Sequence, residues 1–100
     1  MDDYVKNASL FDIYGSLLTT NEQEVFRDYY FDDLSLQEIA NNKNVSKSAI
    51  HKTINTTIEK LNFYEDKLKI LSIRGRIKDI LASTSDERLK NEILTAIFDK

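Results

Sequence analysis

The chain has 100 residues and a formal net charge of −3, and 41% of its residues are hydrophobic and 31% charged. This length suits a single domain, and the composition is that of a folded protein rather than a disordered one. The absence of cysteine excludes disulfides and thiolate metal sites. No apolar run approaches the roughly 20 residues of a membrane-spanning helix. The acidic start shows no signal peptide, so we expect a cytoplasmic protein.

Strong helix breakers are almost missing from the sequence. There is no proline, and the only glycines are Gly15 and Gly75. Turns must then be made by Ser, Thr, Asn and Asp, which favours helices joined by capped junctions. We therefore predict an all-α protein that forms a single domain over residues 1–100.

The first third of the chain is predicted to form two helices. Apolar residues recur at helical spacing over residues 4–18. A second helix is expected to be capped by Thr20, with Gln23 completing a capping box, and to end at residues 32–33. Residues 29–31 have strand propensity, but the helical spacing around them and the lack of a second strand favour a helix.

Residues 35–62 have the pattern of a helix-turn-helix. Ser35 and Glu38 form a capping box at the start of a short helix. Asn44 is the candidate for the left-handed turn residue, and Ser46 is expected to cap the next helix. One apolar stripe along that helix is predicted to be core, and it consists of Ile50, Ile54, Ile58 and Leu61.

Helical spacing continues to the C-terminus. Two apolar seams, over residues 61–71 and 70–80, lie on shifted faces, which predicts a bend or a new helix near residues 69–72. Thr84 with Glu87 is expected to cap a last helix. The seams could pack back on the first helices or pair in a coiled-coil-like or helix-exchanged dimer, and we expect a homodimer.

Charge is distributed unevenly along the chain. Residues 1–34 have a net charge of −6, whereas the helix-turn-helix stretch has a net charge of +2. The amides at the start of a helix attract phosphate, and polar side chains there reach phosphates and base edges. The candidate nucleic-acid-binding residues are Lys43, Ser46, Lys47, Ser48, His51, Lys52 and Asn55.

Two other interpretations remain open. One is an ordinary DNA-binding transcription factor, which a palindromic site with half-sites about one helical turn apart would support. The other is that the helix pair is only part of the core, because this geometry is common in proteins that never bind DNA. The chain would then bind a basic protein through acidic residues, namely Asp2, Asp3, Asp12, Asp28, Asp32 and Asp33. A single histidine without thiolates argues against zinc, and no nucleophile–base pair or phosphate loop is visible. We therefore expect neither an enzyme nor a cofactor.

Three segments, LFDIYGSLLT, VFRDYYFDDLSLQEIANNKNVSKSAIHKTINTTIEKL and FYEDKLKI, together resemble the YlxM family of small bacterial proteins. The resemblance covers about residues 10–70, and more loosely SDERLKNEILTAI. The helix-turn-helix of this family is similar to region four of sigma-70-type factors. The resemblance implies a three- or four-helix core with its helix-turn-helix at about residues 35–62 and a helical C-terminal extension over about residues 63–100.

The resemblance also implies a non-enzymatic regulator. The family is linked to the signal recognition particle (SRP) pathway by the position of its gene, so DNA, SRP RNA and the SRP proteins are the implied partners. Only Lys47, Ser48, His51 and Lys52 correspond to recognition-helix positions. Relatives often carry arginine at position 47 and an apolar residue at position 43. Because lysine lacks the planar fork of arginine, a bidentate contact with guanine is not expected here.

Overall fold

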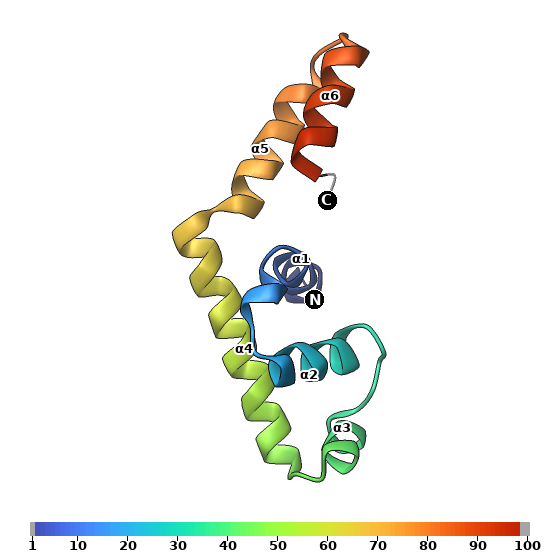
Figure 1. The fold of residues 1–100 in the computed structure, drawn as a ribbon, viewed down its shortest axis with the longest axis vertical. Coiled ribbons are helices and arrows are strands. Elements are labelled where there is room, and N and C mark those ends of the chain that lie inside the picture. The colour runs from blue at the N-terminus through green and yellow to red at the C-terminus, as the bar shows by residue number, and fades with distance from the viewer. Residues whose placement is uncertain (1, 99–100) are drawn as a thin grey trace. The chain divides into compact units, whose positions relative to one another are not determined.

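The computed structural model describes residues 2–98, and within that range every regular element is a helix. The predictions of an all-α fold and of a helix-turn-helix are confirmed (Figure 1). In chain order the elements are α1 (Asp2–Tyr14), the 3-10 helix η1 (Gly15–Leu17), α2 (Thr20–Tyr30), α3 (Leu36–Lys43), α4 (Lys47–Leu68), α5 (Ile70–Ala82) and α6 (Glu87–Phe98). No described helix combines the length and apolarity needed to cross a membrane.

The chain divides into two compact units at the end of α4. We call residues 2–68 the helical core and residues 69–98 the hairpin. The boundary predicted at residue 63 falls inside α4, which continues to Leu68. Each unit has its own packing and is described separately.

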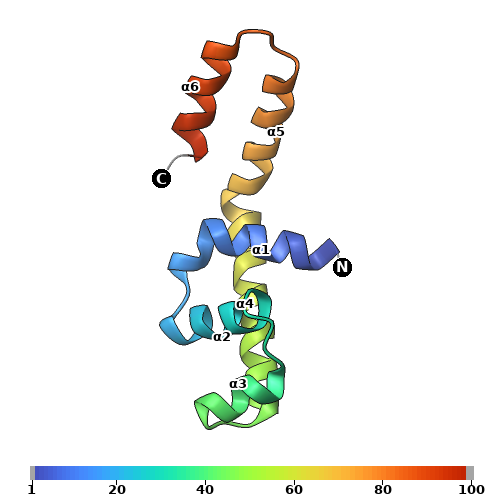
Figure 2. The same cartoon turned by 90° about the vertical axis from the view of Figure 1, so that its right-hand side faces the viewer.

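In the helical core, α1, α2 and α3 lie along one side of α4 (Figures 1 and 2). The predicted stripe of α4 faces them, because Ile50, Ile54 and Leu61 are buried and Ile58 is half-buried. Ile50 and Ile54 pack in one cluster with residues of α2 and α3. The spacing of three and four residues on α4 therefore sets which face the other helices cover.

An aromatic stack joins α1 to α2. The fully buried ring of Phe26 stacks on Phe11 at 4.3 Å and on Tyr30 at 4.2 Å between ring centroids. Tyr4 continues the stack on Tyr30 at 5.3 Å. Asn7, which is buried on α1, donates a hydrogen bond to the Tyr30 hydroxyl at 3.1 Å. The predicted helix over residues 29–31 thus ends in aromatic packing, and no strand forms there.

The capping box at the start of the second helix lies one residue earlier than the sequence predicted. Thr19, rather than Thr20, is the N-cap, and its partner is Glu22 rather than Gln23. The predicted end at residues 32–33 is also wrong, because α2 ends at Tyr30.

The capping box at the start of α3 is confirmed. The Glu38 amide donates to Ser35 Oγ at 3.1 Å, and the Ser35 amide donates to Glu38 Oε1 at 2.8 Å. The hydrogen bond from the Ser35 backbone lowers the pKa of Glu38 below its ordinary value, because it stabilises the charged carboxylate.

In the hairpin, α5 and α6 run antiparallel side by side (Figure 2). The predicted break near residues 69–72 is confirmed, because Lys69 adopts the left-handed conformation with φ of 57°. The predicted cap of the last helix is wrong. Asp86 Oδ1 accepts the Leu89 amide at 3.1 Å, while Thr84 Oγ1 accepts only the amide of Asp86, at 3.3 Å.

Candidate nucleic-acid interface

The turn between α3 and α4 is built on one left-handed residue. Asn44 has φ of 59° and ψ of 46°, as predicted, and it is one of the few residue types that tolerate this region. The amide of Val45 donates to the carbonyl of Ala40 at 3.0 Å, which closes the end of α3. Ala40 is fully buried in the cluster that contains Ile50. The turn and this packing hold the start of α4 against α3.

Ser46 caps the start of α4. Its Oγ accepts the backbone amide of Ala49 at 3.1 Å, and its carbonyl accepts the amide of Ile50 at 3.2 Å. The predicted cap is confirmed. The hydroxyl of Ser46 is therefore engaged in the fold, while the remaining amides of the first turn carry the partial positive charge of a helix start.

Five of the candidate residues form one exposed face on the first turns of α4, which we call the α4 face: Lys47, Ser48, His51, Lys52 and Asn55. At about 100° per residue, the last four lie within an arc of about 100°, and Lys47, on the first turn, lies about 40° outside it, in line with the buried stripe. Asn55 Nδ2 lies 3.5 Å from His51 Nδ1, one helical turn away. Ser48, Lys52 and Asn55 lie away from the buried stripe, and Lys47 precedes Ile50, the first buried residue of that stripe, so all five side chains are exposed to a ligand.

A hollow of about 300 Å³ opens beside this face. Leu36, from the first turn of α3, lines it together with Lys47, Ser48 and His51. Leu36 was not among the candidate site residues. Its half-buried side chain gives the hollow an apolar wall beside three polar groups.

Lys43 does not belong to the α4 face. Its Nζ lies 2.7 Å from Glu24 Oε1 on α2, and its side chain is 23% exposed. This ion pair ties α3 to α2, an arrangement that sequence spacing did not reveal. Of the four lysines of the motif, Lys60 is also paired, with Glu22. Lys47 and Lys52 make no ion pair within residues 2–98.

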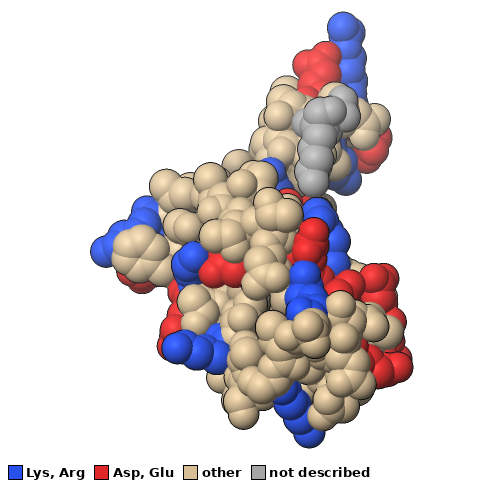
Figure 3. Space-filling model, turned by 60° about the horizontal axis from the view of Figure 1, so that its bottom comes forward, with Lys and Arg blue, Asp and Glu red and all other residues tan. Residues whose placement is uncertain are grey.

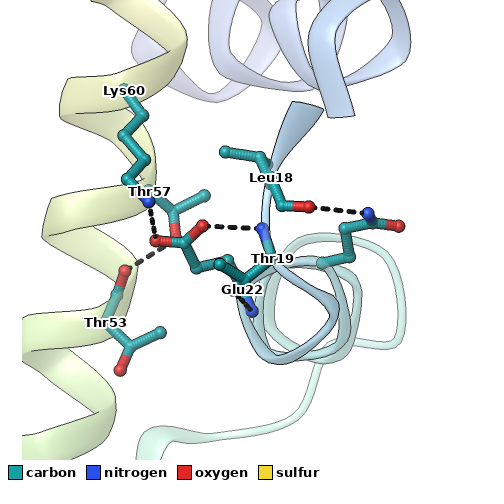
Figure 4. Close-up of polar contacts among 7 residues, drawn as sticks. Leu18, Thr19, Glu22, Thr53, Thr57 and Lys60 are labelled. Atoms are coloured by element: carbon teal, nitrogen blue, oxygen red, sulfur yellow. Dashed lines mark hydrogen bonds and ion pairs between the residues drawn. The ribbon is translucent and has the colours of Figure 1, made fainter. Parts of the chain in front are cut away.

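The carboxylate of Glu22 joins the start of α2 to the middle of α4 (Figure 4). Oε1 accepts the Thr19 amide at 2.9 Å, and Oε2 lies 2.8 Å from Lys60 Nζ. Burial by itself would raise the pKa of Glu22, but the bonds from Lys60 and Thr19 outweigh it, so the pKa is lowered. Bonding to Glu22 likewise raises the pKa of Lys60. Sequence reasoning missed this pair, although T-x-x-E is visible at residues 19–22.

Acidic side chains gather at one edge of the surface in Figure 3, and lysines and arginines are dispersed over the rest of that face. Asp3, Asp32 and Asp33 are exposed, Asp28 is half-buried, and none of the four makes an ion pair with another described residue. The structure does not describe the side chain of Asp2. Asp3, Asp32 and Asp33 are therefore open to solvent, whereas Asp12, which is also exposed, has a partner within the chain.

Helices α3 and α4 and the left-handed turn between them define a helix-turn-helix protein. Residues 1–99 match the model of the UPF0122 family, described as "Putative helix-turn-helix protein, YlxM / p13 like". The chain belongs to this family. The match confirms the family predicted from the sequence, and its description is that of a helix-turn-helix protein rather than of an enzyme.

Bacterial relatives match over most of their length. A UPF0122 protein of Fusobacterium nucleatum is 38% identical over 93% of this chain and 90% of its own length. One from Malacoplasma penetrans is 42% identical over 92% of this chain and 86% of its own length. A third, from Halalkalibacterium halodurans, is 35% identical over 99% of this chain and 94% of its own length.

Proposed function

We propose that the protein is a regulator that binds nucleic acid through the α4 face, in or near the SRP pathway. The observation that carries the proposal is that Lys47 and Lys52 are exposed and unpaired within the described chain, at the capped start of α4. Lysines at a helix start combine a full positive charge with backbone amides that face the same phosphate. The nucleic acid is DNA or SRP RNA.

The charge distribution supports this orientation. Residues 1–34 have a net charge of −6 and would be repelled by a polyanion, whereas residues 47–55 of α4 carry two lysines and no acidic side chain, and Glu59 follows one turn later on the same side. A polyanion would therefore approach the protein from the side of the α4 face. The hollow beside Leu36 adds an apolar wall that a base or a thymine methyl group could contact.

The link to the SRP pathway comes from the family resemblance. It predicts that SRP RNA is the better ligand of the two and that the SRP proteins are possible partners. An ordinary transcriptional regulator would instead prefer duplex DNA, with half-sites about one helical turn apart. The two alternatives therefore differ in the nucleic acid that is bound most tightly.

A salt titration of binding, followed by fluorescence anisotropy, tests the proposal. The probes are labelled SRP RNA and a random DNA duplex, and the variant is Lys47→Glu/Lys52→Glu. We expect a slope of log K against log salt of about −2 to −3 for a chain that neutralises two to three phosphates. The double variant should abolish binding, because two attractive contacts become repulsive.

The matched control is Lys6→Glu/Lys67→Glu. It makes the same change in net charge at two exposed lysines outside the α4 face, so it should retain most of the affinity. Equal loss of binding in both double variants would show that only net charge matters. If neither probe binds at low salt, the α4 face is not a nucleic-acid interface.

The acidic residues offer a second candidate function, as a surface for a basic protein. The observation in its favour is that Asp3, Asp28, Asp32 and Asp33 have no ion-pair partner within residues 2–98. In that case Lys47→Glu/Lys52→Glu would leave binding to the basic partner unaffected. Asp32→Asn/Asp33→Asn would weaken it and flatten its salt dependence.

A further inference from the structure

The hairpin has a thin core of its own. Leu81 is the only one of its side chains that is buried, among the residues that the structure describes. Helix α6 has no buried residue at all, although five of its twelve residues are large and apolar. A two-helix unit of this size falls below the roughly 40 residues at which a domain usually folds without disulfides, metals or oligomerisation.

Covalent and metal supports are absent from the hairpin. The sequence contains no cysteine. Residues 2–98 contain no cluster of three or more side chains that could hold a metal ion. Association with another polypeptide is then a usual support for so small a unit.

One flank of α5 is open and apolar. Ile73 is 50% exposed and Ile80 is 66% exposed, and the half-buried Ile77 lies between them on the same face. Steps of four and three residues are those of a coiled-coil seam, in which each side chain inserts between side chains of a facing helix. Leu89, on α6, is 47% exposed.

The opposite flank of α5 is already covered. Arg74 lies 5.2 Å and Lys78 4.5 Å from the centre of the Phe98 ring, so these side chains lie over α6. Cationic groups thus occupy the side of α5 that faces α6, and the three isoleucines lie on the open flank of α5. The open seam is therefore not the face by which the hairpin holds itself together.

A second copy of the same seam is the partner that fits. A helix with isoleucines at these steps is complementary to its own antiparallel copy, so the chain itself supplies the matching surface. Helices of 13 and 12 residues present a face about 20 Å long and about 20 Å wide. Such a face covers about 400 Å² in projection, and the relief of its side chains makes its accessible area larger, in the direction of the roughly 800 Å² that each partner buries in a standard interface.

We propose that two chains pair through their hairpins, with Ile73, Ile77 and Ile80 of each α5 packed against the other copy in a four-helix bundle. The two-fold axis passes near the middle of α5, since the seam is centred there. The pairing involves no residue of the α4 face and needs no nucleic acid. The pairing can therefore be tested independently of the proposed function.

Sedimentation equilibrium of the full chain without nucleic acid tests the pairing. We expect a dimer for the native sequence. In Ile73→Glu/Ile80→Glu the dissociation constant should rise by about 100-fold or more, because two carboxylates per chain would be buried without partners. Circular dichroism should show that helical content is retained, and Ile73→Ser/Ile80→Ser repeats the test without adding charge.

The matched control is Val5→Glu/Leu17→Glu, which places the same charges at apolar side chains of the helical core that are 68% and 56% exposed. This control should remain a dimer. A native chain that is monomeric at 100 μM, or a seam variant that dimerises like the native chain, would overturn the proposal.

A spin label at Arg76→Cys, next to the seam, gives a second measurement. The cysteine-free chain then contains a single label, so a dipolar signal arises only between two copies. Helices packed about 10 Å apart should bring the labels within about 30 Å. A dimer with a longer distance would place the second copy elsewhere and reject the hairpin interface.

Discussion

The helical core and the hairpin are both made of amphipathic helices, but they are stabilised in different ways. The core closes on itself through a stack of buried aromatic rings, two capping boxes and the buried carboxylate of Glu22. The hairpin has Leu81 as its one buried side chain and two surface ion pairs, Arg88–Glu92 and Lys90–Glu87, in which Lys90 is half-buried and the other three side chains are exposed. Similar helix propensity thus gives different stability, because tertiary packing supplies most of the stabilisation of a helix.

The largest expected effect comes from a matched pair of core truncations. Leu61→Ala should destabilise the helical core by about 3–4 kcal/mol, because Leu61 is fully buried between α4 and its neighbours. Leu81→Ala should lower the stability of the hairpin by about 2 kcal/mol and leave that of the helical core unchanged. Urea unfolding gives the totals, and hydrogen exchange assigns each loss to its unit. Loss of protection throughout the chain in Leu81→Ala would show that the units unfold together.

A matched pair of carboxylate replacements comes next. Glu22→Gln should cost about 1–2 kcal/mol at pH 7, because glutamine leaves Lys60 without its charged partner. Glu87→Gln should change stability by less than about 0.5 kcal/mol, since its pair with Lys90 is exposed. Thermal unfolding of both variants checks the difference, and equal effects would contradict it.

The pH dependence of Glu22 has a defined sign. Its pKa is lower in the folded chain than in the unfolded chain, so its contribution is complete above the unfolded value of about 4.3. The contribution is lost as pH falls through the folded pKa. The stability difference between the native chain and Glu22→Gln should therefore shrink between pH 5 and pH 3, measured by unfolding at each pH. A constant difference over that range would show that the charge of Glu22 is not responsible.

Smaller effects are expected at the left-handed residues of the two units. Lys69→Gly should stabilise the hairpin by about 0.5–1 kcal/mol, because glycine adopts positive φ without the steric cost that lysine pays. Asn44→Gly should change the stability of the core by less than about 0.5 kcal/mol, since asparagine already tolerates this region. Thermal unfolding measures both. A loss of stability in Lys69→Gly would mean that the lysine side chain is needed there.

The smallest expected effect is at Lys43. Lys43→Met should cost less than about 1 kcal/mol of stability, because Glu24 is more than half exposed and its ion pair with Lys43 is therefore weak. For nucleic-acid binding, Lys43→Met should change the salt slope less than Lys47→Met, because Lys43 already has a partner. A larger change for Lys43 would place it in the interface.

Local signals in the sequence predicted much of the fold. Ser35 with Glu38, Asn44 and Ser46 each depend on neighbours a few residues away, and all three were predicted correctly. Thr19 and Thr20 both precede suitable partners, so local pattern could not choose between them. The choice depends on Glu22 reaching Lys60 on another helix, which is a tertiary contact.

The sequence grouped Lys43 with the other candidate residues, whereas the structure places it apart from the α4 face. The five residues of the α4 face follow from the helical period and from the position of the cap. Lys43 could not be excluded by the same reasoning, because its partner Glu24 lies on a different helix. Leu36 was not a candidate, because its place beside Lys47 depends on how α3 packs against α4.

The presence of only two unpaired lysines on the α4 face has a kinetic consequence for the proposed binding. A single chain that neutralises so few phosphates dissociates quickly and samples many sites. Two such faces on one dimer would rebind at a high effective concentration, with a gain in avidity of about 10²–10⁴ when both sites are in reach. Residence time would then depend on protein concentration, so the amount of protein in the cell would itself set the regulatory signal.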